Sequence, residues 1–569
     1  MSGFRPWARI GAVLCALAGT ALVLDHQWLD SPTMDEPFHA LASAEYVISG
    51  TYFANLEHPP LTKLLAGLTM RSAGVRPPRF TKPFTMAGAE QPNPFSFQNS
   101  VTPEALFAAA RKPFPLLFLA LVLLAAELAA RWGGSLAGFA TAALLSFEPT
   151  LVGHAGVLHT DVAAALAFLG TLALALLALE KRSLWLWAAT GAALGLSLAT
   201  KFTEIYLVLL LAALALLYVL LVLRAGRHDW RPLGGLAIAF LLAVPALLGP
   251  YALAMRQMTK PEAEQAVRIF LASRGAQPPM VERVVAISRV SKEAGHYLAG
   301  LAGIALQNKV GGGVNVLRGQ LSQTGFWEYF FVAFAVKSSL AFLALVALGL
   351  LALVVRRGAV ADIPVVALLV SAACLFASVM GSSYNIGIRH LMPVYPLLGI
   401  AAVVLLCRAL PVEIAASLLA LGIGGELYET ARVHPHELSF FNALAGGPRN
   451  GAAWLSDSNL DWGQDLYRAC EELETRGLSR EATVAYFGGG DPRHSCPDSR
   501  LFDGQSAEVK PGTYAVSQFL LAAGPELLAL RGKPAPAAAY AALREAVRKR
   551  GKVVGRVGYS VLLVQIAPP

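Results

Sequence analysis

Two adjacent carboxylates, Asp35 and Glu36, lie shortly after the first apolar run of the chain, in the segment DSPTMDEPFH at residues 30–39. A carboxylate in a partly dry site can accept a proton from an attacking hydroxyl, and it can balance positive charge that develops on a sugar ring. On its own, the pair is better explained as a solvated acidic loop. If the loop is catalytic, Asp35 is the expected base, and Glu36 is the weaker candidate that orients a basic neighbour.

The same loop continues into a stiff turn, with the sequence YFANLEHPPLTK at residues 52–63. Pro59 and Pro60 restrict the backbone and stop a helix, so His58 and Lys63 can be held near one anion. A structural turn over a membrane surface explains this segment equally well. Residues 38–50, between the two segments, can form about three turns of helix, roughly 20 Å long. Such a helix would hold both ends of the loop over one cavity.

Charged residues also border apolar runs later in the chain, namely Asp161, Lys201 and the pair Arg389 and His390. Charged residues at membrane borders usually snorkel or pair. Asp161 is expected to anchor Lys201 or to bind an acceptor, and Lys201 to contact a phosphate or to anchor a membrane interface. Arg389 can hold phosphate oxygens through two nitrogens at once.

These residues sit in an unusually apolar chain, with 56% hydrophobic and only 15% charged residues, whereas soluble domains carry about 25% charged residues. Runs of about 20 apolar residues can cross a bilayer. The fold class expected is therefore a multispanning, all-α membrane bundle. About eleven runs are expected to be transmembrane helices, at residues 8–25, 113–130, 135–152, 160–179, 184–199, 203–223, 233–254, 328–355, 363–380, 391–407 and 411–428.

The net charge of +9 does not indicate nucleic-acid binding, because the basic residues lie mostly in short gaps between apolar runs. Short gaps rich in Lys and Arg are typical of the cytoplasmic side. With the N-terminus inside, the long segments 26–112, 255–327 and 430–569 lie outside. Three basic residues near the membrane on the outer side, Arg111, Lys112 and Lys337, oppose this bias. The basic residues of the inside gaps are Arg5, Arg9, Arg131, Lys181, Arg182, Arg224, Arg227, Arg231, Arg356, Arg357 and Arg408.

The tail, residues 430–569, is less apolar and has strand-like patches at 483–487, 513–517 and 553–566 with helix-like runs between them. This pattern predicts a small extracytoplasmic α/β domain after a transmembrane domain at residues 1–429. Cys470 and Cys496 can pair if the tail lies in an oxidising compartment. The segment DSNLDWGQD at residues 457–465 either binds sugar hydroxyls or contains a helix cap formed by Ser458 or Asp461.

Taken together, the Asp35-Glu36 pair and the His58-Pro59-Pro60 turn resemble the first luminal loop of the dolichyl-phosphate-mannose protein mannosyltransferases. The similar lipid A aminoarabinose transferases usually have Lys where this chain has His58. The resemblance extends over about residues 7–430, through the segments EP, HTD, RH and PVYP. It also includes Lys201, and the tail segment looks like one found in bacterial members of this broad family. The motifs lie at residues 148–149, 159–161, 389–390 and 393–396.

The resemblance implies a superfamily C (GT-C) glycosyltransferase in a bacterial inner membrane, which transfers a sugar from a polyprenyl-phosphate carrier with inversion. The expected partners are that donor, membrane lipids, and an acceptor protein, lipid or glycan. The donor phosphate would meet Lys201 and Arg389, with His58 or Lys63 nearby. No cofactor is expected, and neither is a divalent metal, because His154, His159 and Asp161 form no tight ligand motif. A flippase of lipid-linked sugars and a non-catalytic scaffold are the rival interpretations.

Overall fold

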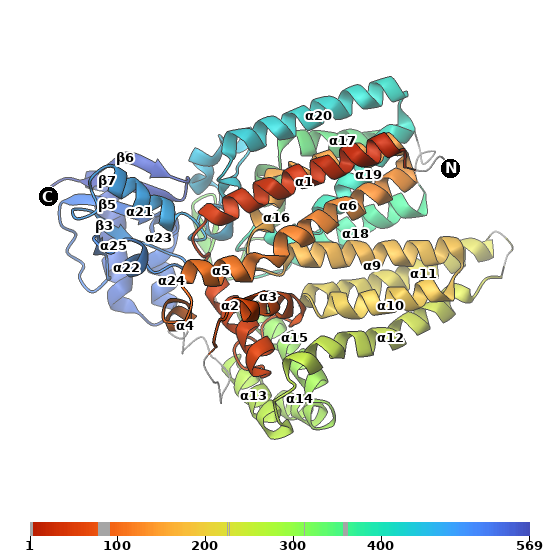
Figure 1. Ribbon diagram of the computed structural model, residues 1–569, viewed down its shortest axis with the longest axis horizontal. Helices are drawn as coiled ribbons and strands as arrows, with labels where there is room; N and C mark the ends of the chain where they lie inside the picture. Colours follow the sequence, from red (N-terminus) through yellow and green to blue (C-terminus); the bar gives the residue numbers. More distant parts are fainter. Residues whose placement is uncertain (1–3, 78–91, 225, 227, 312, 357–361) are drawn as a thin grey trace.

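The computed structural model describes residues 4–77, 92–224, 226, 228–311, 313–356 and 362–569. Arg227 and Arg357, two of the basic residues used for the topology, lie outside these ranges. The long helices run side by side along the longest axis of the molecule (Figure 1). They are α1 (Pro6–Leu29), α6 (Pro113–Gly133), α9 (Asp161–Lys181), α10 (Leu184–Leu198), α11 (Ile205–Arg224), α12 (Arg231–Ala254), α17 (Leu340–Val355), α18 (Ile363–Met380), α19 (Val394–Ala409) and α20 (Val412–Val433).

Within the described residues, six helices are long and apolar enough to cross a membrane, or up to eight if two bent pairs each count as one. The pairs are α7 (Ser135–Ser146) with α8 (Pro149–Ala155), bent by 63°, and α16 (Tyr329–Lys337) with α17, bent by 112°. Every expected run falls on a helix or on a bent pair. However, α10 and α19 are shorter, and α20 carries several carboxylates. A multispanning membrane protein is therefore supported, while the number of eleven crossings stays a prediction.

Shorter helices are formed mainly by the two long segments that follow α1 and α12. Helix α2 (Glu36–Ala44) continues as a wider turn over Glu45–Ser49 and ends at Gly50, whose φ of 71° suits glycine. The remaining helices of this group are α3 (Leu61–Ser72), α4 (Pro92–Phe97), α5 (Pro103–Arg111), α13 (Lys260–Ser273), α14 (Pro278–Val290) and α15 (Lys292–Val310). The hairpin of β1 (Asn315–Leu317) and β2 (Gln320–Ser322) follows α15 in the chain.

The tail forms a five-stranded sheet at the end of the molecule opposite the N-terminus (Figure 1). The strand order is β4-β3-β5-β7-β6, with β3 parallel to both neighbours and the other pairs antiparallel. Cys470 and Cys496 form a disulfide across the base of this unit. The elements are α21 (Leu466–Thr475), β3 (Thr483–Ala485), α22 (Pro492–Ser495), β4 (Arg500–Leu501), β5 (Gly512–Ser517), α23 (Gln518–Ala522), α24 (Gly524–Leu530), α25 (Pro534–Arg550), β6 (Gly551–Val557) and β7 (Val561–Ile566).

The segment that enters the sheet unit is hydrogen-bonded to the loop between α1 and α2. The Ser31 hydroxyl donates to the carbonyl of Gly463 at 2.7 Å, and the Met34 amide donates to the carbonyl of Trp462 at 2.8 Å. Arg468 forms an ion pair with Asp30 at 2.7 Å. These contacts join residues more than 400 positions apart, so the loop that carries Asp35 is fixed by the tail as well as by the bundle.

The sidedness of the tail can be tested directly. A reporter that needs an oxidising compartment, fused after Pro569, is expected to be active, because the Lys-rich and Arg-rich gaps lie on the opposite side. The same reporter fused after Arg182, between α9 and α10, is the matched control and is expected to be inactive. The reverse pattern in whole cells would contradict the topology.

Candidate active site

The two adjacent carboxylates of the first loop occupy different environments. Glu36 is fully buried and forms an ion pair with Arg111, at 2.5 Å to Nη2 and 2.7 Å to Nε. Its oxygens also accept hydrogen bonds from the backbone amides of Thr33, at 2.8 Å, and Leu158, at 3.0 Å. The Thr33 contact joins Glu36, the first residue of α2, to the turn that precedes this helix. Glu36 therefore ties together α2, α5 and the segment before α9, and its acceptor positions are already used.

Asp35, by contrast, keeps 36% of its side chain exposed. One carboxylate oxygen lies 3.1 Å from Nη2 of Arg389 and 3.8 Å from Nε2 of His159. A half-exposed carboxylate beside a cation and an imidazole can take a proton from a hydroxyl that enters from the open side. This environment suits the base role expected for Asp35 and the positioning role expected for Glu36.

His159 connects Asp35 and Arg389 to a buried ion pair. Nη1 of Arg389 donates to Nε2 of His159 at 2.6 Å, and because a guanidinium only donates, the ring proton must sit on Nδ1. Nδ1 lies 2.6 Å from Asp161 Oδ2, and the other oxygen of Asp161 accepts from Lys201 Nζ at 2.6 Å. Asp161 thus holds Lys201, as one of the two sequence interpretations expected, and it also orients His159.

The tail segment supports Arg389 from the opposite side. The guanidinium carbon of Arg389 lies 4.5 Å from the ring centroid of Trp462, which is a cation–π distance. The Ser458 hydroxyl donates to the carbonyl of Ile386 at 2.6 Å. A side chain at Gly387 would collide with that hydroxyl, because an added Cβ would lie 2.0 Å from it. The 3₁₀ turn Ile388–Leu391, which carries Arg389 and His390, is therefore clamped by residues 457–462.

Asp457 is a further carboxylate close to the site. It has a φ of 57°, a left-handed conformation that is costly for a residue with a side chain. Burial raises the pKa of Asp457 to about 7, with the charge of Arg389 opposing this shift and that of Asp35 adding to it. Neither Ser458 nor Asp461, the two cap candidates of one sequence interpretation, caps the helices at Asp457–Asn459 and Leu466–Thr475. Asp461 instead accepts from the Phe519 amide at 2.8 Å, and burial raises its pKa to about 7.

The His-Pro-Pro turn places one of its two candidate residues in the site and the other behind it. His58 is half-buried and lies against the rings of His39 and His159, with centroid distances of 5.1 and 5.6 Å. Lys63 is buried, and its Nζ donates to the carbonyl of His58 at 3.1 Å. Lys63 therefore supports the turn from inside, and burial lowers its pKa well below the usual range.

Three imidazoles of this region have lowered pKa values. Burial lowers the pKa of His39, His58 and His390 well below the usual range, and the charges of Lys63, Lys201, Arg389 and neighbouring imidazoles add to this effect. The ring of His390 lies 6.0 Å from that of Phe330, and the charges of Lys201, Arg389 and Asp161 all act on it. The structure thus brings together Asp35, His58, His159, Asp161, Lys201 and Arg389.

Sequence reasoning gave no role to His39, and it treated Asp457 and Trp462 only as parts of a segment that binds sugar hydroxyls or contains a helix cap. The signal that was available was the density of polar and aromatic residues in the segments 30–39 and 457–465. It did not show that they meet, because the contact joins residues hundreds of positions apart.

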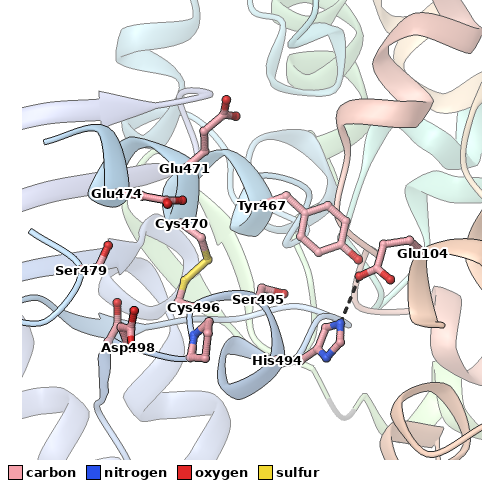
Figure 2. A pocket seen from close by; sticks show the side chains of 12 residues that line it. Glu104, Tyr467, Cys470, Glu471, Glu474, Ser479, His494, Ser495, Cys496 and Asp498 are labelled. Carbon is pink, nitrogen blue, oxygen red and sulfur yellow. Dashed lines mark hydrogen bonds and ion pairs between the residues drawn. A yellow bond between two sulfur atoms is a disulfide. The ribbon is translucent and has the colours of Figure 1, made fainter. Parts of the chain in front are cut away.

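A separate hollow of about 480 Å³ lies between α5 and the helices α21 and α22 of the sheet unit. Figure 2 shows the disulfide on its wall and the contact between His494 and Glu104, which measures 3.1 Å. It contains none of the residues grouped around Asp35. Its lining is mainly acidic and polar: Glu104, Tyr467, Cys470, Glu471, Glu474, Ser479, His494, Ser495, Cys496, Pro497, Asp498 and Ser499.

Residues 104–248 of the chain match the family model described as dolichyl-phosphate-mannose-protein mannosyltransferase. This match confirms the resemblance inferred from the sequence over that segment. The segment contains His159, Asp161 and Lys201 and leaves out Asp35 and Arg389. No curated protein sequence matches the chain.

Three solved structures are similar to the chain at low sequence identity. The Archaeoglobus fulgidus oligosaccharyltransferase is 13% identical, with 93% of this chain and 72% of that chain covered and a TM-score of 0.48. The Saccharomyces cerevisiae protein O-mannosyltransferase Pmt1-Pmt2 complex, bound to its sugar donor, is 19% identical, with 48% and 37% covered and a TM-score of 0.35. ArnT from Cupriavidus metallidurans, bound to undecaprenyl phosphate, is 15% identical, with 98% and 99% covered and a TM-score of 0.35.

Proposed function

We propose that this protein is a glycosyltransferase that moves a sugar from a polyprenyl-phosphate carrier to a hydroxyl group of an acceptor, with inversion at the anomeric carbon. The observation that carries the proposal is the half-exposed carboxylate of Asp35, which lies 3.1 Å from Arg389 and within reach of His159. The family match over residues 104–248 supports the reaction class.

The proposed reaction is a single displacement. Asp35 accepts the proton of the acceptor hydroxyl, and the hydroxyl oxygen forms a bond to the anomeric carbon on the face opposite the phosphate. The carbon–oxygen bond to the carrier phosphate breaks, and the phosphate keeps the electron pair. Cations near the leaving phosphate stabilise the charge that develops there. No covalent intermediate on the protein is required.

Arg389 has two roles in this proposal. Before the donor binds, its guanidinium is paired with Asp35 and His159. A donor phosphate would compete for those same N–H groups, since arginine binds phosphate oxygens through two parallel hydrogen bonds. Donor binding would then release Asp35 from its ion pair at the moment when the base is needed.

Lys201 and Asp161 are better explained as positioning residues than as direct phosphate contacts. Both are buried, and each offsets the charge of the other. Their pairing fixes the orientation of His159, which in turn faces Asp35. His390, whose Nε2 has no hydrogen-bond partner among the described residues, remains a proposed contact for the substrate.

The proposed location is a bacterial inner membrane, with the sheet unit on the outer side. The disulfide between Cys470 and Cys496 supports this placement, because such bonds persist in oxidising compartments. The site then lies at the outer end of the bundle, where a lipid carrier would present its headgroup.

The proposed function is tested with the purified chain in liposomes that contain a radiolabelled polyprenyl-phosphate sugar and peptide, lipid or glycan acceptors. Label is expected to move to an acceptor, and the released carrier phosphate should appear in equal amount. A flippase would move the labelled lipid across the bilayer without releasing the carrier phosphate. A scaffold would do neither, and either result would overturn the proposal.

Replacing Arg389 with alanine is expected to raise the donor KM by about 10- to 150-fold, because a charge-assisted hydrogen bond contributes about 1.5–3 kcal/mol. Arg389→Lys keeps the charge and loses the two-nitrogen geometry, so a smaller increase is expected. Arg268→Ala, which breaks an exposed ion pair with Glu282, is the control and should leave KM unchanged. An unchanged donor KM in a folded Arg389→Ala protein would remove Arg389 from the donor site.

A further inference from the structure

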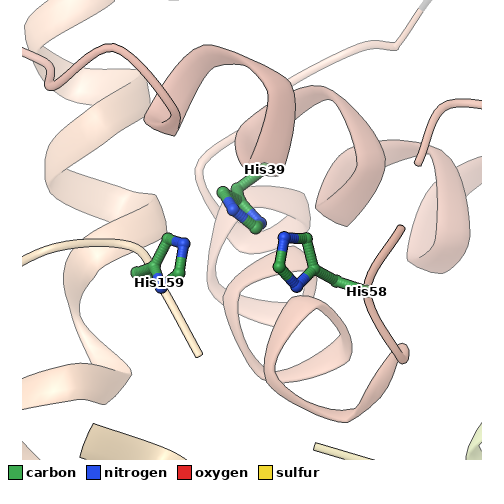
Figure 3. Close-up of side chains that lie close together, drawn as sticks. All are labelled: His39, His58 and His159. Atoms are coloured by element: carbon green, nitrogen blue, oxygen red, sulfur yellow. The ribbon is translucent and has the colours of Figure 1, made fainter. Parts of the chain in front are cut away.

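Three histidines from separate segments converge beside Asp35. His39 comes from α2, His58 from the turn before α3, and His159 from the loop before α9 (Figure 3). One ring nitrogen from each residue lies within 4.8 Å of the other two. The ring centroids are 4.8 to 5.6 Å apart. This arrangement does not follow from general packing, because three polar rings share one small volume.

Two of the three rings have nitrogen atoms that are not otherwise used. Among the described residues, no hydrogen bond is made by a ring nitrogen of His39 or His58, although His39 is 3% exposed. The ring nitrogens of His39 and His58 are therefore free to bind a ligand, and they converge with a ring nitrogen of His159.

From this geometry we propose that His39, His58 and His159 bind a divalent metal ion of the zinc class. Nitrogen donors suit zinc and its neighbours in the transition series rather than magnesium or calcium. Zinc binds histidine nitrogens at about 2.0–2.1 Å in tetrahedral geometry, which places the nitrogens about 3.3 Å apart. The nitrogens now lie up to 4.8 Å apart. Binding zinc would therefore require each pair to approach by at most about 1.5 Å, through rotation of the side chains.

The surroundings of His159 match those of a metal-binding histidine. Such histidines usually present their other nitrogen to a carboxylate, which fixes the ring and raises its basicity. Nδ1 of His159 lies 2.6 Å from Asp161, so Nε2 is the expected ligand atom. The N–H of Arg389 that now contacts Nε2 would turn away, while its ion pair with Asp35 at 3.1 Å can remain.

Two carboxylates and three cations surround the three histidines. The carboxylates of Asp35 and Asp161 balance the charges of Arg389 and Lys201. Lys63, which lies 3.1 Å from the carbonyl of His58, opposes cation binding. This repulsion favours an ion that gains strong bonds to nitrogen over one that relies on charge alone.

Three protein nitrogens leave one tetrahedral position open, as in catalytic zinc sites. Asp35, whose carboxylate lies 3.8 Å from His159 Nε2, is placed to fill that position or to act on an oxygen bound there. Metal binding itself does not depend on the proposed glycosyl transfer. The assignment of the open position to a substrate oxygen does rest on that proposed function.

The test uses the full chain, purified in detergent, stripped with a chelator and then titrated with ZnCl₂ or CoCl₂. One tightly bound ion per chain is expected, and cobalt should give the intense visible absorption of a tetrahedral site without a thiolate charge-transfer band. His39→Gln and His58→Gln should each weaken binding at least tenfold. His494→Gln, in α22 of the sheet unit, is the matched control and should bind zinc as tightly as the original chain does.

Two measurements keep the outcome decisive. If His39→Gln does not fold, the half-buried His58→Gln and the stoichiometry of the original chain still decide, because absence of a bound ion overturns the site. Equal binding by the His58→Gln protein also overturns it. Full transfer activity in protein that binds no zinc would overturn the metal site and leave the glycosyltransferase proposal standing. Zinc binding without any transfer would support the metal site and overturn the glycosyltransferase proposal.

Discussion

Asp35→Asn is expected to lower the rate of sugar transfer at least a hundredfold while expression and donor binding stay normal. The change keeps the shape of the side chain and removes its ability to accept a proton. General base catalysis typically contributes about 10²–10⁴-fold. Because 36% of the Asp35 side chain is exposed and its partners among the described residues are Arg389 and His159, the fold should tolerate the amide. The measurement is single-turnover transfer from a radiolabelled donor, with donor affinity determined separately.

Asp457→Asn is the matched control, because Asp457 is the other carboxylate close to Arg389 and Asp35. A small effect is expected there if Asp35 is the base. Near-normal turnover of Asp35→Asn together with an inactive Asp457→Asn protein would transfer the base role to the tail. Near-normal turnover of both variants would show that the loop with Asp35 takes no part in catalysis.

The sequence predicted well those features that depend on local composition. Apolar runs, and the short basic gaps between them, indicated each long helix, because length and apolarity are properties of a continuous segment. The helix expected at residues 38–50 is present as α2, which starts two residues earlier at Glu36, and its continuation over Glu45–Ser49. Pro37 lies in the first turn of this helix, a position that suits proline.

The sequence could not predict which side chains share a partner across the fold. Glu36 and Arg111 are 75 residues apart, and Arg389 and His159 are 230 apart. The spacing of the three histidines gave no ligand motif, since each comes from a different element. Lys63 appeared to be a phosphate contact because it flanks a stiff turn, but burial places it behind His58. Such assignments depend on packing, which one sequence without tertiary contacts does not contain.

The buried pair of Glu36 and Arg111 leads to the largest expected effect on stability. Glu36→Gln leaves the Arg111 charge buried and unpaired, and removal of one partner from a buried ion pair typically costs about 3–5 kcal/mol. The glutamine amide would also oppose an N–H donor, because both carboxylate oxygens of Glu36 already accept from Arg111 or from backbone amides. The expected result is a much lower thermal unfolding temperature in detergent, with reduced yield.

A double-mutant cycle separates this structural role from catalysis. Glu36→Gln with Arg111→Gln removes both charges, so the double variant should be more stable than the sum of the single effects predicts. Recovery should be partial, because Arg111 also donates to the carbonyls of Gln27, at 3.0 Å, and Asp30, at 2.9 Å. Asp35→Asn, one residue away and half-exposed, should barely change the unfolding temperature. If Glu36→Gln instead folds normally and loses only turnover, Glu36 takes part in the chemistry, and the division of roles between the two adjacent carboxylates is wrong.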